Sequence, residues 1–151
     1  MPFRTMLRPI EILLVEDNPG DVGLAREALR DSKVSNLLHV ARDGVEAMDF
    51  LKRRGAFADA SRPDLVLLDL NLPRKNGHEV LAEIKSDPDL RRIPVVILTT
   101  SKEETDIAKS YDHHANCYIT KPIDLGAFLS VVREIESFWL TIVTLPHEDR
   151  P

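Results

Sequence analysis

The chain has 151 residues, enough for one domain that buries roughly 70% of the surface its unfolded chain exposes. Its 20 Lys and Arg against 25 Asp and Glu give a net charge of −5, which argues against a nucleic-acid surface because phosphate backbones attract basic residues. The single cysteine, Cys117, excludes an internal disulfide, and the apolar runs are far shorter than the ~20 residues of a membrane helix. We therefore expect a soluble cytoplasmic protein that contacts neither membranes nor nucleic acid directly.

Short apolar runs alternate with longer amphipathic segments along the chain. In order, the pattern predicts a strand at 12–15, a helix at 21–30, a strand at 37–41, a helix at 44–52, a strand at 65–68, a helix at 76–85, a strand at 95–98, a helix at 101–111, a strand at 117–120 and a helix capped by Asp124. Continuously apolar runs such as 12–15 and 65–68 are typical of parallel strands that are covered on both faces.

Five strands that are each followed by a helix predict an α/β fold with helices on both faces of a five-stranded parallel sheet. Right-handed crossovers favour the flavodoxin-like strand order 2-1-3-4-5 at this size. Ligands of such sheets bind at the carboxyl ends of the strands, beside the point where the strand order reverses. We therefore expect the functional site among the residues that follow Val15 and Leu68.

Three acidic residues occupy the two strand ends at this reversal point. Glu16 and Asp17 follow the first strand, and Asp69 closes the third. Each could be a solvated loop acid, and Asp17 could instead cap the next helix. Carboxylates that meet at one edge repel one another unless a cation lies among them, and oxygen ligands favour a hard divalent ion such as Mg²⁺. A carboxylate can also be the nucleophile in phosphoryl transfer.

Two further strand ends carry groups that bind phosphate. Thr99 follows the fourth strand and offers a hydroxyl, and Lys121 follows the fifth strand and offers a compact positive charge. Lys121 precedes Pro122, so the peptide bond between them is a candidate for the uncommon cis form. The sequence therefore predicts a site for a phosphoryl group and a divalent cation.

These residues resemble the receiver domain of two-component response regulators, from Glu11 to about Phe138. The resemblance rests on a set of motifs in a fixed order: Glu16–Asp17, Asp69 to Pro73 with Gly77 eight residues after Asp69, Thr99, Tyr118 and Lys121–Pro122. It implies a receiver domain at 10–137 and a C-terminal extension at 138–151. It also implies a signalling protein, rather than an enzyme with a separate substrate, that assists its own phosphotransfer and dephosphorylation.

The resemblance implies a role for each site residue. Asp69 would accept a phosphoryl group from a phosphohistidine of a partner histidine kinase. Mg²⁺ would be held by Glu16, Asp17, Asp69 and the backbone carbonyl of Asn71. Thr99 and Lys121 would bind phosphoryl oxygens, and Thr99 and Tyr118 would form a switch that reshapes a protein-interaction face.

The C-terminal extension is too apolar for a free tail. We expect a homodimer contact built from this extension and the face formed by the fourth helix, fifth strand and fifth helix; packing against the protein's own core is the alternative. The residues expected at the contact are Phe138, Trp139, Leu140, Ile142 and Val143. This ending, the segment 117–124 and the insertion at about 55–62 resemble regulators paired with phytochromes, which implies a light-regulated histidine kinase as the phosphoryl donor.

Two other kinds of protein share parts of this pattern. A Mg²⁺-dependent phosphohydrolase of the aspartyl-phosphate type would place a second acid two residues after its nucleophile, where this chain has Asn71. A flavodoxin-like electron carrier would need a Ser/Thr/Gly loop after the first strand, whereas Glu16 and Asp17 would repel a phosphate there. The receiver interpretation is therefore preferred to both.

Overall fold

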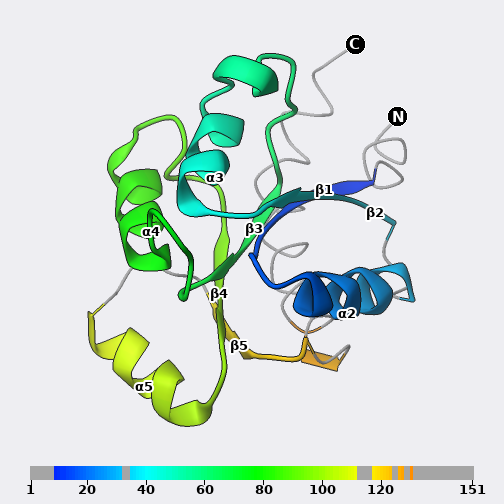
Figure 1. Cartoon of the computed structure of the whole chain (residues 1–151), viewed down its shortest axis with the longest axis vertical. Helices are drawn as coiled ribbons and strands as arrows, with labels where there is room; N and C mark the ends of the chain where they lie inside the picture. The colour runs from blue at the N-terminus through cyan, green and yellow to red at the C-terminus, as the bar shows by residue number, and fades with distance from the viewer. Residues whose placement is uncertain (1–8, 32–34, 112–116, 124–125, 128–129, 131–151) are drawn as a thin grey trace, which may run out of the picture.

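Strands and helices alternate along the chain, as the apolar pattern predicts (Figure 1). The structure, a computed structural model, describes residues 9–31, 35–111, 117–123, 126–127 and 130. Its elements are β1 (Ile10–Val15), α2 (Pro19–Arg30), β2 (Asn36–Ala41), α3 (Gly44–Leu51), the 3-10 turn η1 (Gly55–Phe57), β3 (Leu65–Asp69), α4 (Gly77–Ser86), β4 (Val95–Thr99), α5 (Lys102–Tyr111) and β5 (Cys117–Thr120). In the described part of the chain, none of the helices has both the length and the apolar character needed to cross a bilayer.

The strands form one parallel sheet in the order β2-β1-β3-β4-β5, which confirms the predicted topology. Val15 at the end of β1 pairs with Leu68 of β3, and Thr99 at the end of β4 pairs with Thr120 of β5. The carboxyl ends of β1, β3, β4 and β5 therefore lie along the same edge of the sheet. This register brings the residues that follow these strands together.

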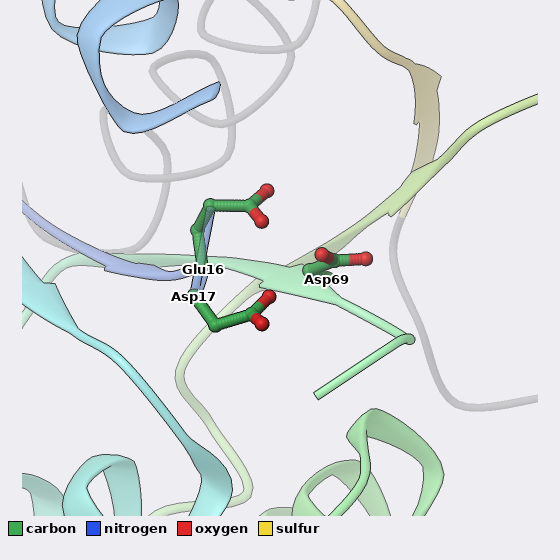
Figure 2. A group of neighbouring side chains, drawn as sticks. All are labelled: Glu16, Asp17 and Asp69. Carbon is green, nitrogen blue, oxygen red and sulfur yellow. The ribbon is translucent and has the colours of Figure 1, made fainter. Parts of the chain in front are cut away.

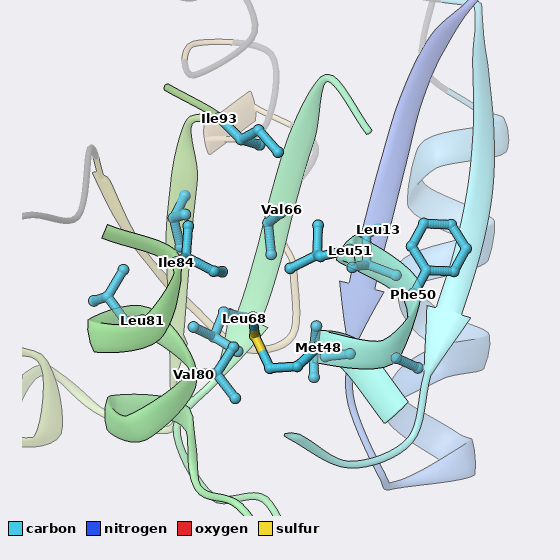
Figure 3. Packing of buried hydrophobic residues seen from close by; sticks show 14 of the residues in the cluster. Leu13, Met48, Phe50, Leu51, Val66, Leu68, Val80, Leu81, Ile84 and Ile93 are labelled. Atoms are coloured by element: carbon cyan, nitrogen blue, oxygen red, sulfur yellow. The ribbon is translucent and has the colours of Figure 1, made fainter. Parts of the chain in front are cut away.

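Helices cover both faces of the sheet, because alternate strand residues point to opposite sides. On one face, residues such as Leu13 and Val66 pack against Met48 of α3 and Ile84 of α4 (Figure 3). On the other face, residues such as Leu14 pack against α2. Figure 1 shows α2 on one side of the sheet and α3, α4 and α5 on the other. The central strands β1, β3 and β4 are therefore buried on both faces, as their continuously apolar runs predict, whereas the edge strands β2 and β5 are only partly buried.

Several element boundaries differ from the predicted ones by one or two residues. β1 begins at Ile10 rather than at residue 12, because parallel pairing with β2 already starts there. α2 begins at Pro19 rather than at residue 21, because Asn18 is its N-cap and accepts a hydrogen bond from the amide of Asp21 at 3.0 Å. Since Asn18 caps α2, Asp17 is not the helix cap, and that alternative for Asp17 is wrong.

Gly77 begins α4 and lies against the end of β3. Its amide donates a hydrogen bond to the carbonyl oxygen of Leu70 at 3.1 Å. A Cβ atom on Gly77 would lie 2.5 Å from the carbonyl oxygen of Asp69 and 2.6 Å from the Cα of Leu70. Only glycine permits this close approach, so α4 and the backbone at Asp69 pack directly together.

Candidate functional site

Three carboxylates from β1 and β3 meet at the carboxyl edge of the sheet (Figure 2). Glu16 and Asp17 follow β1 directly, and Asp69 is the last residue of β3. One oxygen from each side chain lies within 4.8 Å of one from each of the others. Glu16 is only 1% exposed and Asp69 only 2% exposed, whereas Asp17 is exposed. The predicted acidic cluster is therefore present, and Glu16 and Asp69 are not solvated loop acids.

Lys121, which follows the edge strand β5, reaches the acidic cluster with its side chain. Its Nζ donates hydrogen bonds to Asp69 Oδ2 at 3.2 Å, to Glu16 Oε1 at 3.1 Å and to Asp21 Oδ2 at 3.0 Å. The peptide bond between Lys121 and Pro122, a candidate for the cis form from the sequence, is cis. Asp21, in the first turn of α2, was missed by the sequence reasoning, because its contact with Lys121 depends on how α2 packs beside β5. One ammonium group thus contacts carboxylates from three separate elements.

Burial and mutual repulsion shift the pKa values of this cluster. Burial, together with the hydrogen bond and negative charge of Asp69, raises the pKa of Glu16 from 4.5 to about 7, although Lys121 partly opposes the shift. Burial alone would lower the pKa of Lys121, but its hydrogen bonds to Asp21 and Glu16 and the charge of Asp69 raise this pKa above its usual value. The cluster therefore carries more negative charge than Lys121 can balance.

The donor set fits a hard divalent cation. Glu16, Asp17 and Asp69 supply carboxylate oxygens only, and such ligands select Mg²⁺, Ca²⁺ or Mn²⁺ over softer metals. Asp17 is exposed, so a cation held there could keep water ligands, as Mg²⁺ usually does. The excess negative charge of the cluster is what such a cation would neutralise.

Asn71 lies in the β3–α4 connection beside the phosphoacceptor candidate. Its amide donates a hydrogen bond to Asp69 Oδ1 at 3.1 Å, so the backbone of this connection orients the Asp69 carboxylate. Its side-chain amide donates to Glu104 Oε2 at 3.4 Å. Glu104 also accepts from the Thr100 hydroxyl at 2.7 Å, so it joins the β3–α4 connection to the start of α5. Nothing in the sequence pattern had indicated this role for Glu104.

The two predicted switch residues lie on adjacent strands. Thr99 is fully buried, and its hydroxyl lies 2.6 Å from the hydroxyl of Thr105 on α5. Tyr118 of β5 is half-buried and packs against the core cluster that α3 and α4 share with the sheet. Sequence reasoning did not identify Thr105, because neither its residue type nor its spacing marks a site.

The predicted dimer contact lies outside the described residues. It comprises Phe138, Trp139, Leu140, Ile142 and Val143, and the helix expected after Asp124 falls largely outside them as well. The role of these residues in a dimer contact therefore stays a prediction.

Comparison with known proteins identifies the family. The sequence matches the response regulator receiver domain over residues 12–133. The chain belongs to this family. It is 54% identical over 138 residues to the response regulator Rcp1 of Synechocystis sp., covering 91% of this chain and 94% of that protein. The acids, the threonine and the lysine that carried the resemblance therefore lie within a receiver domain.

Solved structures of related receivers agree in fold. The phosphorylated cyanobacterial phytochrome response regulator RcpA is 56% identical, covers 89% of this chain and 96% of that chain, and superposes with a TM-score of 0.71. The bacteriophytochrome response regulator AtBRR is 42% identical, covers 87% of this chain and 96% of that chain, and superposes with a TM-score of 0.80. A Mn²⁺-bound form of Rcp1, 53% identical over 87% of this chain and 95% of that chain, has a TM-score of 0.69. This receiver is thus a signalling protein homologous to phytochrome response regulators, which favours neither the phosphohydrolase nor the flavodoxin-like alternative.

The raised pKa of Glu16 predicts a pH-dependent stability of the receiver without divalent cations. Because the folded-state pKa of about 7 lies above the ordinary value of 4.5, the folded protein holds a proton that the unfolded chain loses between these pH values. The free energy of unfolding should therefore fall by on the order of 1–3 kcal/mol as pH rises from about 5 to 8. Urea unfolding at each pH, with a metal chelator present, measures this free energy of unfolding. In Glu16→Gln the free energy of unfolding should depend less on pH. The same pH dependence in the variant and the wild type would contradict the prediction.

Proposed function

We propose that this receiver accepts a phosphoryl group on Asp69 from a phosphohistidine of a partner histidine kinase, and that the kinase is of the phytochrome type. The observation that carries the proposal is the contact of Lys121 Nζ with Asp69 Oδ2 at 3.2 Å inside the acidic cluster. The phytochrome-type partner is supported by the names of the relatives, Rcp1 and RcpA among them.

The chemistry follows from how the Asp69 carboxylate is held. The amide of Asn71 holds Oδ1, and Lys121 Nζ lies 3.2 Å from Oδ2, which would be the attacking oxygen once Lys121 shifts to the phosphoryl group. A bond forms between Oδ2 and phosphorus as the phosphorus–nitrogen bond of the phosphohistidine breaks, and the imidazole leaves with the electron pair. Lys121, already beside Oδ2, would pair with an equatorial phosphoryl oxygen as negative charge builds there.

A divalent cation, which we propose is Mg²⁺, would supply further neutralisation of phosphoryl charge when bound. Glu16, Asp17, Asp69 and the backbone carbonyl of Asn71 would hold it. The carboxylate oxygens within 4.8 Å of one another support the assignment of the first three. The negative charge of Asp69, which together with burial raises the pKa of Glu16, supports it as well.

Output would pass through protein contacts rather than through turnover of a substrate. Thr99 would move toward the phosphoryl group and donate a hydrogen bond from its hydroxyl to a phosphoryl oxygen. Tyr118 would then move into the space that Thr99 vacates, which would reshape the face around β5. Water would later remove the phosphoryl group at the same site. In this proposal the receiver works in a cytoplasmic phosphorelay and is not an enzyme that acts on a separate substrate.

Labelling of the intact protein tests this function. With acetyl phosphate and Mg²⁺, each chain should take up one phosphoryl group that is stable in acid and labile in base, as an acyl phosphate is. Chelation of the metal should suppress uptake. Catalytic turnover of many phosphomonoesters without a stable labelled protein would instead indicate a phosphohydrolase. Phosphoryl transfer from a phytochrome-type kinase, but not from an unrelated histidine kinase, tests the partner.

We propose further that the receiver domain spans 10–137 and that residues 138–151 contribute to a homodimer. The apolar side chains of the extension support this, because a solvated tail would not carry them. The molar mass in solution should be that of a dimer for the full chain and that of a monomer after removal of 138–151. An unchanged molar mass would contradict the dimer role and favour packing of the extension on its own domain.

A further inference from the structure

The hydroxyl of Thr99 is already engaged in a hydrogen bond with another hydroxyl. Thr99 Oγ1 lies 2.6 Å from Thr105 Oγ1, and Thr105 Oγ1 in turn donates to the carbonyl oxygen of Ser101 at 3.0 Å. A hydroxyl has one proton and a carbonyl oxygen can only accept, so both contacts are hydrogen bonds at once only if Thr105 donates to Ser101. Thr105 therefore accepts in the short contact, and the only hydroxyl proton of Thr99 points to Thr105.

Thr105 is held firmly in this position. Its amide donates to the Ser101 carbonyl oxygen at 3.0 Å, the same atom that accepts from its hydroxyl. Thr99 is fully buried at the end of β4, so its hydroxyl cannot exchange Thr105 for bulk water. A buried hydroxyl without a partner costs free energy, which makes this contact a stable resting arrangement of Thr99.

We propose that Thr105 is a positioning residue that holds the Thr99 hydroxyl in the unphosphorylated conformation and so sets the balance between the resting and phosphorylated states. The inference rests on the proposed function, in which Thr99 donates to a phosphoryl oxygen on Asp69. Thr99 has one proton, so it cannot donate to Thr105 and to the phosphoryl group at once. The bond to Thr105 is therefore lost on activation, and its free energy opposes activation.

Thr105→Val tests the proposal, because valine keeps the shape of threonine and removes the acceptor. The probe is beryllofluoride, a phosphoryl mimic, titrated with Mg²⁺ present and followed by calorimetry. The affinity should rise roughly 2- to 10-fold, the range expected from one net hydrogen bond. Thr105→Ser, which retains the hydroxyl, should bind within about twofold of the wild type. An unchanged affinity of a folded Thr105→Val protein overturns the proposal. If the valine variant does not fold, Thr105→Ala is used in its place, with the same expected result.

A double-mutant cycle separates this role from a general effect on α5. With Thr99→Ala as the background, Thr105→Val should leave the beryllofluoride affinity unchanged, since no switch hydroxyl remains to be released. An equal rise in both backgrounds would show that Thr105 acts only through the packing of α5, and would also overturn the proposal. Labelling of the wild type at Asp69 by acetyl phosphate is the separate check of the proposed function. If the wild type is not labelled at Asp69, the proposed phosphoacceptor function is wrong. If it is labelled but Thr105→Val leaves the beryllofluoride affinity unchanged, only the role of Thr105 is wrong.

Discussion

Replacing Asp69 by asparagine is expected to reduce phosphoryl uptake from acetyl phosphate by at least roughly 100-fold, because an amide is not a nucleophile toward phosphorus. The change should not unfold the protein. It removes the negative charge that helps raise the pKa of Glu16, and the single amide oxygen can still accept from either Lys121 Nζ or the amide of Asn71, so one hydrogen bond is lost. Incorporation of labelled phosphate, with unfolding in urea measured in parallel, separates loss of chemistry from loss of structure.

Asp89→Asn is the matched control for this change. Asp89 lies in the connection between α4 and β4, at the amino edge of the sheet, and its side chain is 88% exposed. This variant should take up phosphate as the wild type does. Uptake by Asp69→Asn at the wild-type level, or a label found on Asp17 in the wild type, would show that the phosphoacceptor has been assigned wrongly.

Gly77→Ala is expected to lower the free energy of unfolding by about 1–3 kcal/mol and to weaken divalent-cation binding. The added methyl group would lie 2.5 Å from the carbonyl oxygen of Asp69 and 2.6 Å from the Cα of Leu70. Both are backbone atoms, so relief of the clash must displace either α4 or the end of β3 that carries the Asp69 carboxylate. Urea unfolding measures the first effect, and titration with Mn²⁺ measures the second.

Gly23→Ala provides the contrast, since Gly23 is also helical but nothing lies within 4 Å of its Cβ position. There, alanine should stabilise the protein by about 0.5–1 kcal/mol because it restricts the unfolded chain. Opposite signs for the two variants would confirm that contact with β3, rather than helix propensity, requires glycine at position 77. Stabilisation by both would show that α4 can move away from Asp69 at little cost.

The parallel sheet covered on both faces could be read from the sequence because burial imposes its apolar pattern, and right-handed crossovers then favoured the strand order. Runs such as 12–15 and 65–68 are apolar at every position, and only strands covered on both faces bury such runs completely. Strand ends were less certain, since β1 and α2 each begin two residues earlier than their apolar residues indicate. Pairing of the β1 backbone with β2 and capping by Asn18 extend these elements independently of hydrophobicity.

The sequence by itself determined which chemical groups lie at the carboxyl edge, because parallel strands end together and place Glu16, Asp69 and Lys121 there. Only the tertiary structure decided which of these groups and their neighbours touch. The contacts of Lys121 with Asp21 and of Thr99 with Thr105 depend on helix placement and on side-chain rotamers. Helix positions and rotamers can shift side-chain atoms by a few ångströms without changing which residues are buried. The hydrophobic pattern that specifies the sheet therefore carries no information about these contacts.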